Sequence, residues 1–166
     1  MSKKKQRAKK AWGQSLAMTA ATAVSGSIAT DTDTLWYKAL DKPKWQPPGW
    51  LFPIVWTGLY AGIAATSARS IEALENRGKG DEADRFRAAL GTNLVLNQAW
   101  SWTFFKAQKL GPATGVAAAL AASSIDLARR SGDVDKGKGL ELTPYALWCS
   151  FATVLTASIW RRNKRK

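Results

Sequence analysis

The segment that decides the fold class is residues 45–68, WQPPGWLFPIVWTGLYAGIAATSA, which contains no Asp, Glu, Lys or Arg. An α-helix needs about 20 mainly apolar residues to cross about 30 Å of hydrocarbon. Four further uncharged segments of similar length occupy residues 11–30, 88–105, 110–125 and 142–160. All 25 Lys and Arg and all 12 Asp and Glu lie outside the five segments. The pattern therefore predicts an all-α integral membrane protein, a bundle of five transmembrane helices.

Two of these segments are only weakly hydrophobic for membrane helices. Residues 11–30 and 110–125 consist mostly of Ala, Ser, Thr and Gly, and the charged ends lower the mean hydropathy of the chain to −0.23. Small residues suit close helix–helix contact. A soluble helical bundle with Ala-rich contacts is the alternative, but the segment lengths favour the membrane.

The 166 residues suit a single domain. We expect a basic tail at residues 1–10, a membrane domain over 11–160 and a second basic tail at 161–166. Polar residues from Gln14 onward interrupt the apolar run that a cleaved signal peptide needs, so we expect the first segment to be retained. Fifteen of the 25 Lys and Arg fall on the side of the N-terminus. This excess favours a cytoplasmic N-terminus, although the basic C-terminus argues against it.

The composition excludes several classes of enzyme. The chain has no His, which removes Ser–His–Asp catalysis, His-ligated zinc and His-ligated haem. The single Cys149 removes internal disulfides and thiolate clusters. We therefore predict no metal site and no required cofactor. The net charge of +13 lies at the ends of the uncharged segments, where basic residues bind acidic lipids, so we expect the lipid bilayer and no nucleic acid as a partner.

Aromatic residues lie deep inside the predicted helices. At 1.5 Å per residue, Trp56 is about 16 Å from the start of its segment and Trp148 about 18 Å from the end of its segment. Tryptophans that anchor a helix lie at the membrane interface instead. Tyr60 is one turn from Trp56, and Ala152 is one turn from Trp148. These positions predict aromatic walls near the middle of the bilayer.

Amides lie on one face of the third predicted helix. Asn93 and Asn97 recur with the period of a helix, the same face continues to Trp100 and Phe104, and Gln98 lies beside it. Polar groups in a membrane helix face the bundle interior, where either Asn alone is explained by a hydrogen bond between helices. Together with the deep aromatic residues, the amides predict a pocket for a flat, largely apolar ligand.

The most specific motif spans residues 36–60, WYKALDKPKWQPPGWLFPIVWTGLY. Its pattern, W-Y-x2-L-x-K-P-x-W-x-P-P followed by P-x-V-W-T-x-L-Y, resembles the tryptophan-rich sensory protein/translocator protein family, also called the peripheral-type benzodiazepine receptors. The segments ALGTNLVLNQAWSWTFF (89–105) and LTPYALWCSFATVL (142–155) agree with it. The resemblance covers roughly residues 11–163.

The resemblance implies a membrane receptor or carrier that binds porphyrins such as protoporphyrin, and other flat apolar molecules, in a cavity under the first loop. The family residues that line this cavity match Trp36, Tyr37, Trp56, Tyr60, Asn93, Asn97, Gln98, Trp148 and Ala152. The alternative is an enzyme that degrades porphyrin in light, with Trp56 and Trp148 as electron relays and no other catalytic residue assigned.

The family is also usually dimeric, so we expect a homodimer. We place it in a bacterial cell membrane rather than in the mitochondrial outer membrane. The sterol-linked pattern of the family needs a Tyr upstream of the basic C-terminus, but no Tyr follows Tyr145. Tight sterol binding is therefore not expected.

Overall fold

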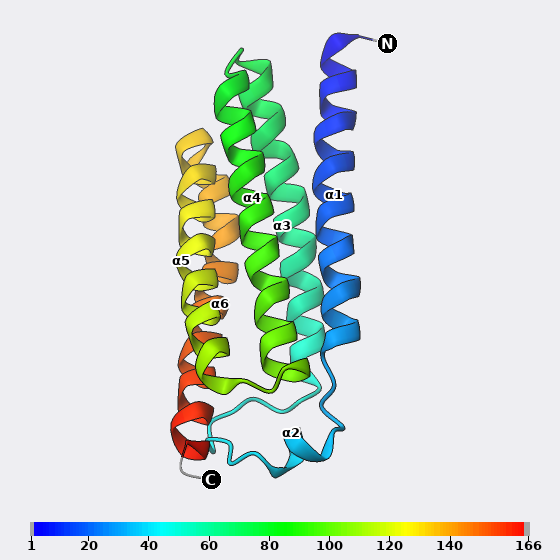
Figure 1. The fold of residues 1–166 in the computed structure, drawn as a ribbon. Coiled ribbons are helices and arrows are strands. Elements are labelled where there is room, and N and C mark those ends of the chain that lie inside the picture. Colours follow the sequence, from blue (N-terminus) through cyan, green and yellow to red (C-terminus); the bar gives the residue numbers. More distant parts are fainter. Residues whose placement is uncertain (1, 165–166) are drawn as a thin grey trace.

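The computed structural model describes residues 2–164 and is built from helices. Figure 1 shows long helices that run alternately up and down, with the two termini at opposite ends. A short helix, α2, lies in the first loop. The elements are α1 (Lys3–Ala29), α2 (Leu35–Ala39), α3 (Leu51–Asn76), α4 (Gly80–Ser101), the π-helical turn η1 (Trp102–Lys106), α5 (Leu110–Val134) and α6 (Lys136–Asn163).

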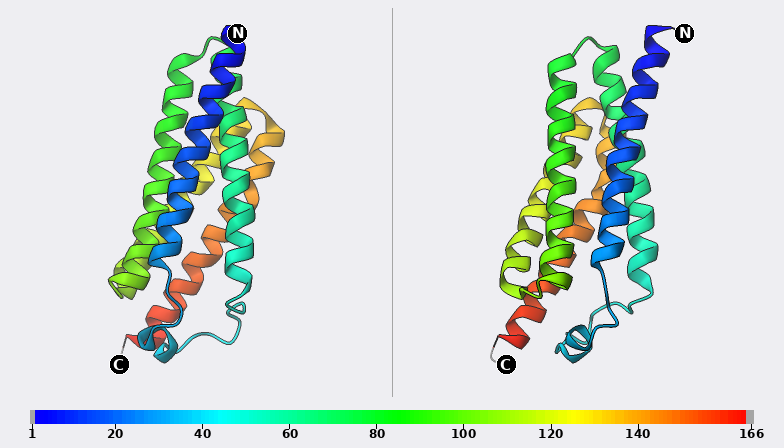
Figure 2. Two further views of the ribbon diagram at one scale, coloured as in Figure 1. Left: turned by 90° about the vertical axis from the view of Figure 1, so that its right-hand side faces the viewer. Right: turned by 45° about the vertical axis from the view of Figure 1, so that its right-hand side comes forward.

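The long helices surround a common core. α1 packs on α3 and α4, α3 packs on α6, and α5 packs on both α4 and α6 (Figure 2). The order around the bundle is therefore α1, α3, α6, α5, α4. α5 and α6 approach closely at Gly132 and Gly139, where a Cβ on Gly139 would lie 2.8 Å from the Cα of Gly132. Only glycine allows the two backbones to meet at this distance.

Several helices extend beyond the uncharged segments. α1 begins at Lys3, so the described part of the N-terminal segment 1–10 is helical rather than a separate tail. α6 likewise continues into the C-terminal basic segment as far as Asn163. The expected connections 69–87 and 126–141 are mostly helical, and Asp135 alone separates α5 from α6. The reason is visible in α5, where Asp126 pairs with Arg130 one turn later at 2.6 Å and supports the helix outside the apolar part.

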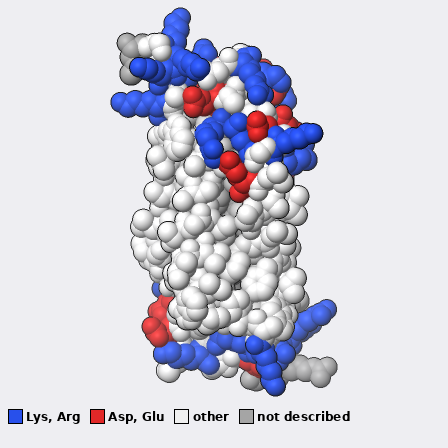
Figure 3. Space-filling model, turned by 180° about the vertical axis from the view of Figure 1, so that it is seen from behind, with Lys and Arg blue, Asp and Glu red and all other residues white. Residues whose placement is uncertain are grey.

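The surface has the charge distribution of a membrane protein. Figure 3 shows a band without charged residues between two charged ends. In the described chain, three helices are long and apolar enough to cross a membrane: α3, α5 and α6, each with an 18-residue stretch whose mean hydropathy is 1.3. α1 is rich in small polar residues, and α4 begins with charged turns and carries amides, which lowers the hydropathy of both. The all-α membrane architecture is confirmed, while the count of five crossings stays a prediction.

Candidate ligand cavity

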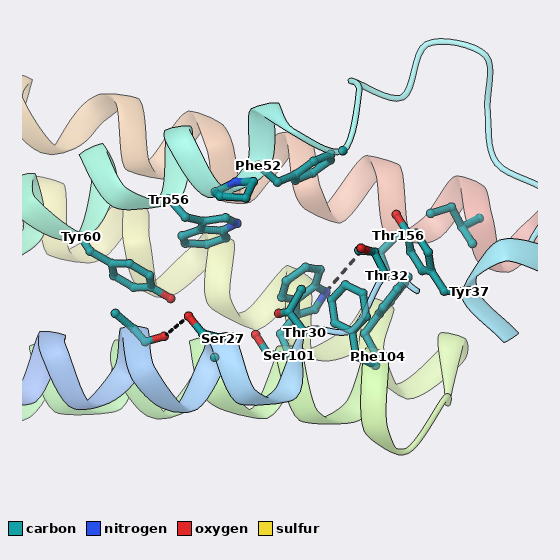
Figure 4. Close-up of a pocket in the computed structure, with 17 residues that line it drawn as sticks. Ser27, Thr30, Thr32, Tyr37, Phe52, Trp56, Tyr60, Ser101, Phe104 and Thr156 are labelled. Atoms are coloured by element: carbon teal, nitrogen blue, oxygen red, sulfur yellow. Dashed lines mark hydrogen bonds between the residues drawn. The ribbon is translucent and has the colours of Figure 1, made fainter. Parts of the chain in front are cut away.

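A cavity of about 360 Å³ opens into the bundle near the end that carries α2. Figure 4 shows its walls, which come from α1, α3, α4 with η1, and α6, with α2 beside the mouth. The residues that line it are mostly apolar or aromatic, with several hydroxyls: Ala23, Gly26, Ser27, Thr30, Thr32, Tyr37, Gly49, Phe52, Pro53, Trp56, Tyr60, Trp100, Ser101, Phe104, Phe105, Thr156 and Ile159.

Two aromatic groups form the sides of the cavity. On α3, the rings of Trp56 and Tyr60 stack with centroids 5.3 Å apart and an interplanar angle of 29°. On the side of α4, the rings of Trp100 and Phe104 lie 5.7 Å apart at 31°. Figure 4 shows open space between Trp56 and Tyr60 on one side and Phe104 on the other. Aromatic walls of this kind bind flat apolar ligands by offset stacking.

The π-helical turn η1 presents consecutive aromatic residues to the cavity. The N–H of Ala107 donates to the carbonyl of Trp102, five residues earlier, at 2.9 Å. Phe104 and Phe105 are both buried, and both line the cavity. Such turns are frequent at functional sites.

The first loop forms the roof of the cavity. The Thr34 hydroxyl accepts a 3.2 Å hydrogen bond from the N–H of Tyr37 and caps α2. The ammonium of Lys42 lies 4.3 Å from the centroid of the Tyr37 ring. Burial raises the pKa of the Tyr37 phenol, an effect that the hydrogen bond from Gln46 partly offsets, and burial lowers the pKa of the Lys42 amine.

The end of α6 fastens this roof. The Asn163 side chain accepts from the N–H of Asp41 and donates to its carbonyl, each at 3.0 Å, and the Arg162 guanidinium lies 3.5 Å from the Asp41 carboxylate. This double hydrogen bond connects positions 122 residues apart. We call the three residues the C-terminal clasp.

The predicted amides Asn93 and Asn97 are buried beneath the cavity rather than lining it. Tyr145 of α6 lies between them: its hydroxyl donates to Oδ1 of Asn93 at 2.8 Å and accepts from Nδ2 of Asn97 at 3.4 Å. Asn93 also donates to Ser124 of α5 at 3.0 Å, and Asn97 accepts from Tyr60 at 2.8 Å. The two amides therefore join four helices, as buried polar groups in a membrane bundle usually do.

The remaining predicted residues take different positions. Tyr37, Trp56 and Tyr60 line the cavity. Trp36 and Gln98 are not among the lining residues. The Trp36 ring packs edge-on against the lining residue Phe104 at 5.7 Å, and Gln98 donates to the carbonyl of Thr22 on α1 at 2.6 Å.

On α6, Trp148 and Ala152 are not among the lining residues. The Trp148 ring contacts Phe52 and Phe151, at 5.8 and 5.3 Å, and Ala152 lies one turn from the lining Thr156. Trp56 therefore lines the cavity, whereas Trp148 contacts the lining residue Phe52 and does not line the cavity itself.

The wall contributed by α1 was not predicted from the sequence. Ala23, Gly26, Ser27 and Thr30 recur at i, i+3, i+4 and i+7, which is one helix face. Their small size makes room, since a Cβ on Gly26 would lie 3.7 Å from the Tyr60 hydroxyl. Phe104 shares the predicted face of Asn93, Asn97 and Trp100, and this helical period is the sequence signal that points to it.

Comparison with known proteins agrees with this architecture. Residues 15–161 match the TspO/MBR family. The chain is similar to protein CrtK of Rhodobacter capsulatus, with 34% identity over 77% of this chain and 78% of that protein. It is similar to the tryptophan-rich protein TspO of Bacillus cereus, with 32% identity over 82% of this chain and 86% of that protein. It is also similar to the human translocator protein, with 30% identity over 77% of this chain and 75% of that protein.

Proposed function

Because the chain belongs to the TspO/MBR family of membrane proteins, we propose that it is a receptor or carrier that binds a porphyrin in the cavity under α2. The observation that carries this proposal is the pair of aromatic groups on opposite sides of one cavity, Trp56 with Tyr60 and Trp100 with Phe104. A planar macrocycle is the shape that such a slot accommodates.

The size and polarity of the cavity support the proposal. A volume of about 360 Å³ is within the range of small-molecule sites, about 300–1,000 Å³. The lining has hydroxyls at Ser27, Ser101 and Thr156 but no Asp, Glu, Lys or Arg. An uncharged ring system therefore enters without leaving a buried charge unpaired.

Basic residues in the roof suit the carboxylates of a porphyrin. Lys42 lies over the Tyr37 ring, and Lys38 of α2 lies 3.1 Å from Asp33 on the surface of the loop. A macrocycle that enters from the mouth would keep its carboxylates near these ammonium groups and in contact with water.

The geometry supports binding over degradation in light. The degradation hypothesis uses Trp56 and Trp148 together as relays beside the ligand, but Trp148 contacts Phe52 and Phe151 and is absent from the cavity lining. We therefore treat the porphyrin as a ligand that the protein holds and releases unchanged.

The decisive experiment is the absorbance of protoporphyrin mixed with detergent-purified protein, first in darkness and then under illumination. We expect a saturable shift of the porphyrin bands in darkness that persists in light. A shift followed by protein-dependent bleaching with product formation would support the degrading enzyme, and no shift would refute porphyrin binding.

We further propose that the protein functions as a homodimer in a bacterial cell membrane. The bacterial relatives support the location. Chemical cross-linking in intact membranes tests the dimer, and a monomer band alone would contradict it.

A further inference from the structure

Several buried polar atoms of neighbouring helices lack hydrogen-bond partners and lie apart from the hydrogen-bond network of Asn93 and Asn97. Among the described residues, seven buried side-chain N or O atoms have no hydrogen-bond partner. Five of the seven belong to the three helices α1, α3 and α4: Ser15 Oγ, Thr19 Oγ1, Ser67 Oγ, Gln98 Oε1 and Glu75 Oε2. We call the hydroxyls of Ser15, Thr19 and Ser67 the polar seam.

The three hydroxyls of the polar seam are fully inside the bundle. Ser15 and Ser67 are 0% exposed and Thr19 is 3% exposed. Other buried hydroxyls bond to the carbonyl one turn earlier, as Ser70 does to Thr66 at 2.8 Å and Thr22 to Met18 at 2.9 Å. The seam hydroxyls do not form this bond, so each retains an unused donor and acceptor in a low-dielectric core.

The helix register places Thr19 and Ser67 at one depth and Ser15 one turn farther from the cavity. At the cavity end, Gly26 of α1 lies beside the Tyr60 hydroxyl of α3. The two helices are antiparallel (Figure 2), so seven residues from this level lead to Thr19 on α1 and to Ser67 on α3. Ser15 follows one turn later. Ser67 also shares the helix face of Tyr60, two turns away.

Polar groups stand at both ends of the seam. At the cavity end, Gln98 donates to the carbonyl of Thr22, one turn from Thr19, and keeps its Oε1 without a partner. At the far end, Arg87 donates from Nε to the side chain of Gln14 at 3.1 Å, next to Ser15. Arg87 also pairs with Glu75, whose carboxylate is 15% exposed and has one oxygen without a partner.

The spacing suits water. One helical turn of three or four residues advances about 5–6 Å, and a water molecule with a hydrogen bond of about 2.8 Å on each side spans nearly the same distance. Buried waters in proteins bond to polar groups that otherwise lack partners. We propose that the polar seam holds a chain of water molecules that conducts protons between the ligand cavity and the Glu75–Arg87 pair at the opposite end of the bundle.

This function is distinct from porphyrin binding and does not depend on which ligand the cavity holds. Through the water chain, groups inside the bundle exchange protons with the ligand cavity at one end and with the Glu75–Arg87 pair at the other. Intramembrane polar side chains commonly mark such pathways. Each step moves a proton between a water molecule and a neighbouring water or hydroxyl, and no group is consumed.

The test is proton flux into liposomes that contain the full-length protein and an internal pH dye. A potassium gradient with valinomycin drives proton entry. We expect the wild-type protein to admit protons at several times the rate of protein-free liposomes. Thr19→Val and Ser67→Ala, which remove a seam hydroxyl and keep the volume nearly unchanged, should each reduce this excess at least threefold. A flux equal to that of protein-free liposomes, or one that both substitutions leave unchanged, would overturn the proposal.

The matched control is Ser70→Ala. Ser70 is also 0% exposed on α3, but its hydroxyl already bonds to Thr66, so the flux should stay at the wild-type rate. An equal loss in Ser70→Ala and Ser67→Ala would show a general packing effect and refute the role of the seam. Melting temperature and porphyrin absorbance of each variant report whether the bundle and its cavity are intact. If the wild-type protein shows proton flux but no shift of the porphyrin bands, the proposed function is refuted and the seam remains supported.

Discussion

The hydroxyl of Tyr60 on α3 donates a 2.8 Å hydrogen bond to Oδ1 of Asn97 on α4, so a residue of the cavity wall is also the first member of the buried hydrogen-bond network. The ring of Tyr60 stacks on Trp56, while its hydroxyl orients Asn97 toward Tyr145. The two parts of this side chain therefore have separate tasks. Packing of the ring shapes the cavity, and the hydroxyl joins α3 to α4.

Tyr60→Phe separates these tasks. The ring remains, but Asn97 Oδ1 loses its donor, and an unsatisfied buried acceptor costs about 1–3 kcal/mol. We expect thermal unfolding in detergent to show this loss, while the affinity for protoporphyrin changes less than threefold. A variant with unchanged stability would contradict the role of the hydroxyl in the network.

The close crossing of α5 and α6 predicts that one added methyl group at Gly139 destabilises the protein. Gly139→Ala would place a Cβ 2.8 Å from the Cα of Gly132 and 3.1 Å from the carbonyl oxygen of Ala128, both backbone atoms. The helices must separate, so we expect a loss of about 1–3 kcal/mol in the free energy of unfolding. Gly115→Ala on α5 is the control, since nothing lies within 4 Å of its Cβ. Equal stability of the two variants would rule out the close crossing.

The C-terminal clasp holds the roof over the cavity, so we expect it to slow the dissociation of a bound porphyrin. Asn163→Ala removes both hydrogen bonds to Asp41 and leaves the 3.5 Å ion pair between Arg162 and Asp41, so the attachment of the roof to α6 is weakened. We expect faster dissociation of bound porphyrin and faster amide exchange over residues 36–46, with little change in melting temperature. Stopped-flow dissociation and hydrogen exchange measure these effects.

Arg161→Ala is the control for the clasp, because Arg161 is exposed and outside the clasp. Dissociation rates that are the same in Asn163→Ala and the wild type would show that the roof does not limit ligand release.

The buried phenol of Tyr37 predicts a response to alkaline pH. Its pKa is raised in the fold, so the neutral form is favoured there relative to the unfolded chain. This contribution to stability is present below the ordinary Tyr pKa of about 10 and is lost as the pH rises through the folded pKa. The difference in phenolate absorbance between wild type and Tyr37→Phe should give a midpoint above 10. A midpoint at or below 10 would contradict burial of the roof.

The sequence predicted much of this architecture from distances along the chain. Each of the five uncharged segments has most of its residues in a long helix, although residues 45–50 of the second segment lie in the loop before α3. The face of Asn93, Asn97, Trp100 and Phe104 points inward. The helix ends were less predictable, because charged turns such as those of α5 continue a helix when they pair with one another.

The positions of side chains relative to the cavity depend on contacts between helices, which periodicity does not contain. Asn93 was expected at the ligand, but Tyr145 of α6 occupies its hydrogen-bonding capacity. Trp148 has the depth of a wall residue but faces Phe52 and Phe151. Phe105 lines the cavity from the π-helical turn η1, a local helix type that the sequence pattern does not reveal. Each difference arises from a neighbour distant in sequence or from a local change of helix type.

The measurement that tests porphyrin binding most directly is a protoporphyrin titration of wild type, Trp56→Ala and Trp12→Ala, with tryptophan fluorescence as the readout. Trp56 belongs to the cavity wall, whereas Trp12 lies near the start of α1, away from the lining. Loss of an aromatic stacking surface costs about 1–3 kcal/mol, which corresponds to roughly 5- to 150-fold in Kd. The account predicts saturable binding that weakens by this factor in Trp56→Ala and is unchanged in Trp12→Ala. Equal affinity in all three proteins, or no saturable binding, would contradict it.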